Sequence, residues 1–472
     1  MTGIRKDGDR AARPDGRDGT EIDDAAQPRP GAEQEADSRP DETTAVARGN
    51  PVTAPWRVVA PPVEPARRPL RTSFAVGAGR AVAGMSRRLR LGSGGMIGGR
   101  LAQSLQPGLL GTLATGRRIV LITGTNGKTT TTELVAEALR SRGAATSNVT
   151  GANMLDGHVA ALMTDLSAPF AALEVDELHL DRVVTEFTPA VVVLLNLSRD
   201  QLDRVGEVRT VQQSLRRALA RAPQTRVVAN RDDPNVVSVA ADHPAVTWVS
   251  GGARWTRDAL NCPRCGSFLD DVEGEWRCGC GLARPPADWT VTGAGLTGPD
   301  GLDRRLAVQL PGQVNRINAA FAVAAATELG CDADAVLRRI SAMRHASGRY
   351  SAVRLDGWAV RLLLAKNPAS WLEMLDLVAA HDRHLVLAVN SREPDGHDVS
   401  WLWDVDFESL RGRAVTVTGE RGLDLAVRLR YADVGCEVVP TVRDALPNAG
   451  EEPDVIANYT AFRDLLVRSV PR

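Results

Sequence analysis

Apolar and polar residues along this chain form blocks that predict alternating strands and helices. Short apolar runs rich in branched side chains, typical of buried parallel strands, recur from residue 118 onward. A first group comprises 118–122, 171–175, 190–195 and 226–229, and a second group comprises 358–364, 384–389, 414–418 and 436–439. Stretches with helical periodicity separate the runs. The first group therefore predicts a doubly wound α/β domain, and the second a smaller α/β domain.

These groups divide the chain into four segments. Residues 117–348 are expected to form the central domain and residues 349–472 the C-terminal domain. Residues 71–116 mix arginine with Val, Leu, Met and Gly, which favours a helical or linker segment packed on the central domain. A basic apolar segment could also contact anionic lipid, but its many glycines weaken a continuous helix. Residues 1–70 contain few large apolar groups, which predicts a disordered tail.

Bulk properties exclude several function classes. A chain of 472 residues is too long for one hydrophobic core, in agreement with more than one domain. With a net charge of -1 and a pI near 6.7, the protein has no global positive field, so nucleic-acid binding is not expected. The charged N-terminal region lacks the apolar core of a signal peptide, and no apolar run is long enough to span a membrane. A cytosolic location is therefore predicted.

Four of the six cysteines crowd into one short segment. They are Cys262, Cys265, Cys278 and Cys280. Two closely spaced cysteine pairs are typical of a tetrahedral zinc site, and four cysteines without an open position indicate a structural site. Two disulfides are the alternative, but they conflict with a reducing compartment. We therefore predict a zinc ribbon inserted in the central domain at residues 255–285, and its metal is not expected to touch the nucleotide site.

A candidate phosphate-binding loop follows the first apolar run. Small residues let backbone N–H groups converge on phosphate oxygens, a lysine neutralises charge, and the next hydroxyl coordinates magnesium. Gly124, Gly127, Lys128 and Thr129 fit these roles and predict binding of ATP with Mg²⁺. The standard motif has a glycine where this chain has Ile122, so the loop is a variant.

The loop Thr123-Gly-Thr-Asn-Gly-Lys-Thr-Thr130 resembles that of the Mur ligase family. The resemblance continues in segments at matching distances, namely Glu174-Val-Asp-Glu177, Asn196 to Arg204, Asn230 to Pro234 and Gly312 to Ala320. It implies that nucleotide is bound by Gly124, Thr125, Asn126, Gly127, Lys128, Thr129, Thr130 and Asn318. It also implies that Thr129 and Glu174 hold Mg²⁺ and that Asn318 faces the adenine. Val314 stands where the family usually has histidine, which puts that contact in doubt.

The cysteine insert and the C-terminal segment are similar to the MurT type within this family. The C-terminal signatures are Lys366-Asn-Pro-Ala369, Glu373 and the segment Asp395 to Glu408, whereas Ser370 replaces a usual glycine. This resemblance implies ATP-dependent amidation of the D-glutamate α-carboxylate of lipid II through an acyl phosphate. Catalytic roles would fall on Lys128, Glu174 and Asp398. Asp398 would complete the active site of a GatD-type glutaminase partner that supplies ammonia, with Asp395, Asp404 and Asp406 as competing choices.

Two other functions fit parts of the sequence. The chain could be a stand-alone amino-acid ligase of the classical Mur or folylpolyglutamate synthase type, acting without a glutaminase. It could also be a nucleotide-gated scaffold in which the loop and the ribbon serve binding only. A lipid II substrate would place the cytosolic protein at the inner face of the membrane, as a peripheral protein.

Overall fold

The computed structural model describes residues 69–89, 95–148, 152–199, 208–252, 260–343, 350–446 and 452–471. Residues 1–68, which make up nearly all of the predicted disordered tail, lie outside these ranges. Residues 200–204, the second half of the predicted segment Asn196 to Arg204, also lie outside them. The predicted boundary at 348/349 also lies outside them. Within the described ranges, no helix combines the length and the apolar character needed to cross a bilayer.

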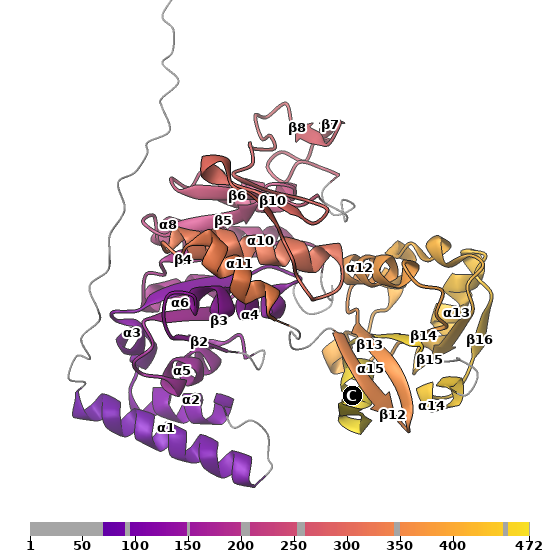
Figure 1. Cartoon of the computed structure of the whole chain (residues 1–472), viewed down its shortest axis with the longest axis horizontal. Helices are drawn as coiled ribbons and strands as arrows, with labels where there is room; N and C mark the ends of the chain where they lie inside the picture. The colour runs from indigo at the N-terminus through magenta and orange to yellow at the C-terminus, as the bar shows by residue number, and fades with distance from the viewer. Residues whose placement is uncertain are drawn as a thin grey trace, which may run out of the picture. The chain divides into compact units, whose positions relative to one another are not determined.

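Nine strands form the central sheet (Figure 1). In spatial order they are β11 (Asp303–Arg305), β10 (Gly295–Thr297), β9 (Trp289–Thr292), β6 (Val246–Ser250), β5 (Arg226–Asn230), β4 (Val191–Leu194), β1 (Arg118–Thr123), β3 (Phe170–Glu174) and β2 (Ala145–Ser147). From β9 to β2 the strands are parallel, and β10 and β11 continue the sheet as antiparallel strands. The four predicted strands of this group are confirmed as β1, β3, β4 and β5.

Helices cover both faces of the central sheet because its strands alternate their apolar side chains between two cores. Ile119 and Leu121 point to one core, and Val120 and Ile122 point to the other. On the first face lie α5 (Leu155–Thr164), α6 (Leu180–Glu186), α8 (Val208–Arg221) and α9 (Pro234–Ala240). On the second lie α4 (Lys128–Leu139), α10 (Gln313–Glu328) and α11 (Ala333–Ser341). The chain leaves β1 for β2 on one side and later returns to β4 on the other. The carboxyl end of β1 is therefore a topological switch point, where open α/β sheets bind ligands.

The segment before β1 is helical, as expected, and its described part consists of three helices. It forms α1 (Leu70–Arg88), α2 (Gly95–Leu105) and α3 (Leu109–Ala114), and α1 is 19 residues long. A Cβ on Gly79 of α1 would lie 2.7 Å from the carbonyl oxygen of Gly98, and one on Gly98 would lie 2.6 Å from that of Gly79. The glycines therefore let α1 and α2 cross in backbone contact. The expectation that glycines weaken a continuous helix fails within α1, where packing on α2 outweighs the intrinsic preference, although the segment as a whole is divided into three helices.

A second sheet of seven strands follows in the C-terminal part. Its order is β16 (Cys436–Val438), β15 (Val415–Thr418), β14 (Leu385–Ala388), β17 (Asp454–Ala457), β13 (Trp358–Leu364), β12 (Tyr350–Leu355) and β18 (Val470–Pro471). The first five strands are parallel, and β12 and β18 are antiparallel additions. The four predicted strands are confirmed as β13 to β16. The sequence pattern did not indicate β12, β17 or β18.

Helices also cover both faces of this second sheet. One core includes side chains of α12 (Pro368–Ala379), α13 (Gly422–Tyr431) and the 3-10 turns η4 (Ser400–Asp404) and η5 (Phe407–Leu410). The other includes side chains of α14 (Val442–Ala445) and α15 (Tyr459–Arg468). The start of α12 and the segment containing η4 hold the predicted C-terminal signature residues.

Candidate active site

The predicted phosphate loop lies between β1 and α4, at the switch point. Gly124 and Gly127 have φ angles of 135° and 85°, which side-chain-bearing residues rarely adopt. A Cβ on Gly127 would lie 2.9 Å from Oδ1 of Asn318, so a larger residue would push α10 away from the loop. The Lys128 ammonium donates to the Gly124 carbonyl at 2.7 Å, and this bond holds the charge over the loop. Thr130 is buried in the first turn of α4.

Two oxygen ligands for a divalent cation lie side by side next to this loop. The Thr129 hydroxyl donates to Oε2 of Glu174 at 2.8 Å, although the two residues come from different elements. Glu177 lies 3.0 Å from the Lys128 ammonium. A hydroxyl and a carboxylate are donors that Mg²⁺ prefers when substrate phosphates and waters complete its shell. The residues present therefore fit the predicted magnesium site.

Glu174 is fixed through its backbone by two buried side chains. The Asn148 amide accepts from the Glu174 N–H and donates to the Glu174 carbonyl, at 2.8 Å and 2.9 Å. The Nε2 atom of His158 donates to the same carbonyl at 2.8 Å. Burial lowers the pKa of His158 to about 4, so its ring is neutral at pH 7 and adds no positive charge beside the cation site.

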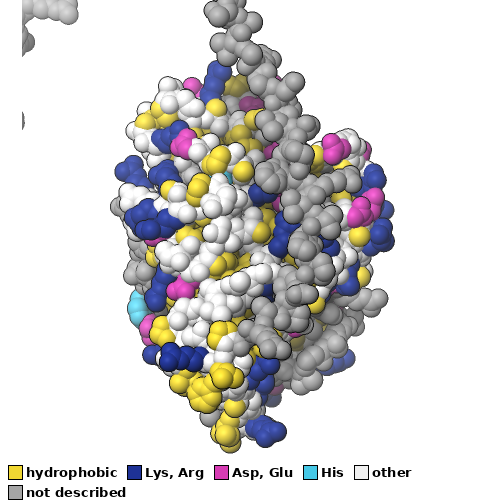
Figure 2. All heavy atoms as spheres, turned by 90° about the vertical axis from the view of Figure 1, so that its left-hand side faces the viewer, with side chains coloured by type: hydrophobic (Ala, Val, Ile, Leu, Met, Phe, Trp, Pro, Cys, Tyr) yellow, Lys and Arg dark blue, Asp and Glu magenta, His cyan; other side chains and the backbone are white. Residues whose placement is uncertain are grey.

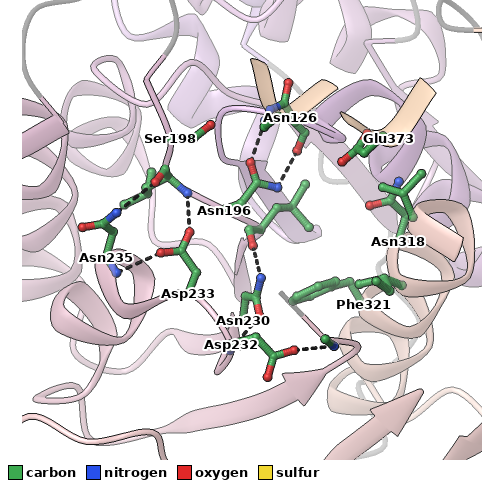
Figure 3. A pocket seen from close by; sticks show the side chains of 16 residues that line it. Asn126, Asn196, Ser198, Asn230, Asp232, Asp233, Asn235, Asn318, Phe321 and Glu373 are labelled. Carbon is green, nitrogen blue, oxygen red and sulfur yellow. Dashed lines mark hydrogen bonds between the residues drawn. The ribbon is translucent and has the colours of Figure 1, made fainter. Parts of the chain in front are cut away.

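A cleft next to the loop has the lining of a nucleotide pocket (Figure 3). It encloses about 890 Å³, including space open to solvent. Asn126, Asn318 and Phe321 lie on its walls together with Val314 and Ile317. Aromatic and aliphatic faces beside amide groups suit a flat heterocycle whose edge carries donors and acceptors. The cleft thus brings the predicted loop and Asn318 together, and it also includes Val314.

The two predicted turns after β4 and β5 build the opposite wall and are hydrogen-bonded to each other. The Asn230 amide donates to the Leu195 carbonyl at 2.9 Å. Asp233 accepts from the backbone N–H of Leu197 at 2.7 Å through one oxygen and from that of Asn235 at 2.8 Å through the other. The second of these bonds caps α9. The Asn196 side chain in turn pairs with the backbone of Asn126 in the phosphate loop at 2.9 Å and 3.0 Å.

The four cysteines of the insert converge as predicted. All four sulfur atoms lie within 4.8 Å of one another, and none forms a disulfide. Cys262 and Cys280 approach to 3.5 Å, and Cys265 and Cys278 to 3.4 Å. The two-stranded sheet of β7 (Asp270–Val272) and β8 (Glu275–Arg277) links the two pairs. Four sulfurs at these separations fit a tetrahedral zinc ion.

The ribbon is joined to the nucleotide cleft through a residue that the sequence analysis missed. Arg284 donates to the carboxylate of Asp232, which lines the cleft, and to the Ser250 hydroxyl at 3.2 Å. Asp232 also accepts from the N–H groups of Gly251 and Gly252, both at 2.8 Å. The prediction that the metal itself does not touch the nucleotide site stays a prediction, but the protein part of the ribbon reaches the cleft through Arg284. The partners are far apart in sequence and form no motif, so no local pattern signalled it.

The first part of the C-terminal signature contacts the phosphate loop. The Asn126 and Asn367 side-chain amides donate to each other's oxygen at 3.3 Å and 3.2 Å. Asn367 caps α12 by accepting from the Ser370 N–H at 3.0 Å, and the Ser370 hydroxyl accepts from the Asn367 N–H in return. Ser370, the departure from the usual glycine, thus completes a capping box and leaves the loop intact. Ala369 and Glu373 of α12 reach the wall of the cleft.

The four candidate aspartates of the C-terminal loop differ in environment. Asp395 is buried and accepts hydrogen bonds from both the N–H and the hydroxyl of Thr460. Asp404 forms an ion pair with Arg199 at 3.2 Å. Asp398 and Asp406 are exposed. A 2.8 Å bond from the Ser400 backbone N–H holds the pKa of Asp398 below its usual range, so its carboxylate stays ionised.

A second hollow links Asp398 to the start of α12. It spans about 370 Å³, including space open to solvent, and Asp398, Trp401 and Asp404 line it. Arg199, Lys366 and Asn367 are also among its lining residues. Because Asn367 contacts Asn126, this hollow lies next to the phosphate loop.

Comparison with known proteins agrees with this geometry. The profile of the Mur ligase middle domain matches residues 122–266, and that of the MurT ligase C-terminal domain matches residues 364–462. The lipid II isoglutaminyl synthase (glutamine-hydrolyzing) subunit MurT of Streptococcus pneumoniae is 30% identical, over 80% of this chain and 93% of its own. Its Staphylococcus aureus counterpart is 29% identical, over 74% and 86%. Among solved structures, MurF of Acinetobacter baumannii shares the fold, with a TM-score of 0.58 and 16% identity over 78% of this chain and 80% of its own.

Proposed function

The chain belongs to the MurT family of Mur-type ligases, and from this premise we propose that it amidates the D-glutamate α-carboxylate of the lipid II stem peptide at the expense of ATP. The observation that carries the proposal is the grouping of Lys128, Thr129 and Glu174 at the phosphate loop, whose Asn126 lines an amide-rich cleft. Such a grouping suits phosphoryl transfer to a carboxylate during peptidoglycan synthesis.

The chemistry follows from the poor reactivity of a carboxylate toward amines. One carboxylate oxygen of the substrate attacks the γ-phosphorus of ATP, ADP leaves, and an acyl phosphate results. Ammonia then attacks the acyl carbon, phosphate leaves, and the amide remains. Lys128 and the N–H groups of the loop offset the negative charge of the transferring phosphoryl group. Thr129 and Glu174 would hold Mg²⁺, which would supply further charge neutralisation.

Zinc in the ribbon has a structural role in this proposal. Four thiolates leave no open position for water or substrate. The ion would instead fix the two cysteine pairs, and with them the ribbon that carries Arg284 to Asp232.

Ammonia would come from a separate glutaminase of the GatD type. The two cysteines outside the ribbon are poor nucleophiles, because Cys331 is buried and Cys436 is half-buried on β16. Burial raises the pKa of both thiols, which keeps them protonated. A glutaminase needs a reactive thiol, so a partner subunit would supply it.

We assign to Asp398 the completion of the partner's active site. An exposed, ionised acceptor carboxylate can orient a histidine from another chain. Asp395 and Asp404 are less suited, since their carboxylates are engaged within this chain. The hollow beside Asp398 would offer ammonia a short path to the phosphate loop.

An exposed aromatic surface that suits a protein partner is formed by Trp403 of the same loop and Tyr431 of α13. Trp403 and Tyr431 are both exposed and meet edge to face, with ring centroids 5.3 Å apart. Arg428 stacks 5.6 Å from the Trp403 ring and pairs with Glu408, whose pKa this charge lowers to about 2. Exposed aromatic side chains fixed in this way are typical of interface anchors, and Trp403 lies in the same loop as Asp398. We propose that the glutaminase docks here.

Amidation with two nitrogen sources tests the proposal. The purified chain is incubated with lipid II, ATP and Mg²⁺, and with either an ammonium salt alone or glutamine plus the glutaminase, and the lipid is analysed by mass spectrometry. We expect the amide in both reactions, and glutamine without the glutaminase should give none. Incorporation of an amino acid would identify a stand-alone ligase instead, and nucleotide binding without turnover would identify a scaffold. The lipid-linked substrate further implies that the protein acts at the inner face of the membrane.

A further inference from the structure

Helix α1 presents its large apolar side chains to solvent and its small ones to the protein. The residues buried against its neighbours are Thr72, Ala75, Val76, Gly79 and Ser86. By contrast, Leu70, Phe74 and Met85 are 89%, 69% and 62% exposed. At about 100° per residue, these three lie within about 60° of one another, on the side opposite the buried face. Surface helices ordinarily show the reverse pattern, and an exposed apolar stripe of this kind indicates an interaction surface.

Arginines border the exposed stripe. Arg71 and Arg87 lie on either side of it on the helical wheel, and Arg88 lies near its end; all three are exposed. The sequence contains no aspartate or glutamate between Pro65 and Thr132. The stripe therefore has a positive rim with no acidic side chain of its own segment to neutralise it.

The same character continues onto the start of α2. Leu89 follows α1, and Met96 and Ile97 lie in the first turn of α2, all of them exposed. Figure 2 shows apolar side chains gathered beside dark blue arginine and lysine side chains at the lower end of the molecule, where α1 lies in Figure 1. Leu70, Phe74, Met85, Leu89, Met96 and Ile97, with Arg71, Arg87 and Arg88, are called the α1 face below.

We propose that the α1 face lies on an anionic lipid bilayer. Apolar side chains between flanking arginines match the boundary between acyl chains and acidic headgroups, where long cationic side chains extend to the phosphates. The surface is independent of the nucleotide site, and the proposal rests on the proposed function only in that a lipid-linked substrate gives such docking a purpose. A second copy on the same face would bring arginines together with no acidic partners, so charge disfavours self-association.

Arg80 shows how α1 is held while its outer face stays available. Its guanidinium donates to the Met163 carbonyl at 2.9 Å and to the Thr164 carbonyl at 3.4 Å, at the end of α5. The close crossing at Gly79 and Gly98 adds a second fixed point. The helix is therefore a fixed part of the fold, and binding needs no refolding.

Vesicle flotation of the full-length chain tests the proposal without nucleotide or lipid II. The vesicles are phosphatidylcholine with or without about one third phosphatidylglycerol, a fraction typical of anionic surfaces. We expect flotation with anionic vesicles at low salt, less at high salt, and little with phosphatidylcholine alone. Replacing Arg71, Arg87 and Arg88 together by glutamine should lower partitioning about a hundredfold, at about fivefold for each arginine. Phe74→Ser should lower it about tenfold, through lost apolar burial.

Matched controls separate this surface from general stickiness. Leu423 of α13 is 73% exposed, and Leu423→Ser should leave flotation unchanged. All of these residues are exposed, so the melting temperature of each variant should stay at that of the parent. Failure of the full-length chain to float, or equal losses in the Phe74 and Leu423 variants, would overturn the proposal. So would sedimentation showing that Phe74→Ser abolishes a dimer. Amidation is measured separately, so flotation without amidation would count against the proposed function alone.

Discussion

Replacing Arg284 by methionine tests whether the zinc ribbon shapes the nucleotide cleft. Methionine keeps part of the apolar stem but removes the charge that faces Asp232. The two side chains are only 14% and 3% exposed, so the Asp232 carboxylate would remain buried without its cation. Breaking such a pair costs about 3–5 kcal/mol when nothing else stabilises the remaining charge.

The remaining hydrogen bonds of Asp232 reduce this cost. It keeps the Ser250 hydroxyl at 3.0 Å and the N–H groups of Gly251 and Gly252 at 2.8 Å. We therefore expect a loss of about 2 kcal/mol, the value of one strong charged hydrogen bond. If this loss falls on the conformation that binds nucleotide, the Kd for ATP rises about 30-fold.

Calorimetric titration with a non-hydrolysable ATP analogue and Mg²⁺ measures the effect. The matched control is Arg264→Met, which breaks the ribbon's more exposed ion pair with Asp242 and should change affinity by less than about 1 kcal/mol. Adding Asp232→Asn to Arg284→Met removes the uncompensated charge and should recover part of the affinity. A Kd for Arg284→Met equal to that of the control would refute the proposed coupling between ribbon and cleft.

Four further predictions address the other parts of the site. Lys128→Ala should lower amidation more than about a thousandfold with either ammonium or glutamine, because both routes need the phosphoryl transfer; normal ammonium-dependent activity would exclude the loop assignment. Asp398→Asn should lower glutamine-dependent amidation by about three orders of magnitude and spare the ammonium-dependent reaction, whereas Asp406→Asn should spare both; loss of both activities in the Asp398 variant would give this residue another role. His158 has a folded pKa of about 4, below its unfolded value of 6.5, so its contribution to stability is present above pH 6.5 and is lost as pH falls toward 4. Between pH 7 and 5 the parent should therefore lose about 2 kcal/mol more unfolding free energy than His158→Gln, measured by denaturant titration. Removing zinc with a chelator, or Cys265→Ser, should lower the melting temperature and also raise the Kd for ATP. An unchanged Kd would show that the metal does not influence the nucleotide cleft.

The inner strands were predictable because burial of both faces of a strand requires an almost continuous run of apolar side chains. The runs that became β1 and β4 consist almost wholly of apolar residues, as expected for inner strands of a parallel sheet. The outer strands β2, β6 and β9 to β11 mix polar and apolar residues and were not predicted. The helix α1 was misjudged for a related reason. Its glycines carry a cost in an isolated helix, yet here they permit the contact with α2 that stabilises it.

The phosphate loop was predictable because its glycines, lysine and threonine are adjacent in sequence and each has a local physical role. The residues of the remaining wall were predicted only from the family resemblance, because a polar turn after a strand does not by itself reveal which residues lie beside it. Phe321 and Arg284 were missed altogether. One is an apolar residue in an apolar helix, and the other is an arginine in a ribbon rich in charge, so only the folded arrangement sets them apart.

The sequence alone could not choose among the C-terminal carboxylates, and the structure distinguishes them by their environment. The segment from Asp395 to Asp406 contains four aspartates, and the sequence pattern does not show which of their carboxylates a partner could reach. Folding places Asp395 under α15, where Thr460 satisfies its oxygens, and ties Asp404 to Arg199. Exposure alone does not separate Asp398 from Asp406, but only Asp398 of these two lines the hollow that ends at Asn367. Asp398 is the exposed aspartate of this segment that lines the hollow, and for this reason we propose it, and not Asp406, as the carboxylate that serves the partner's histidine.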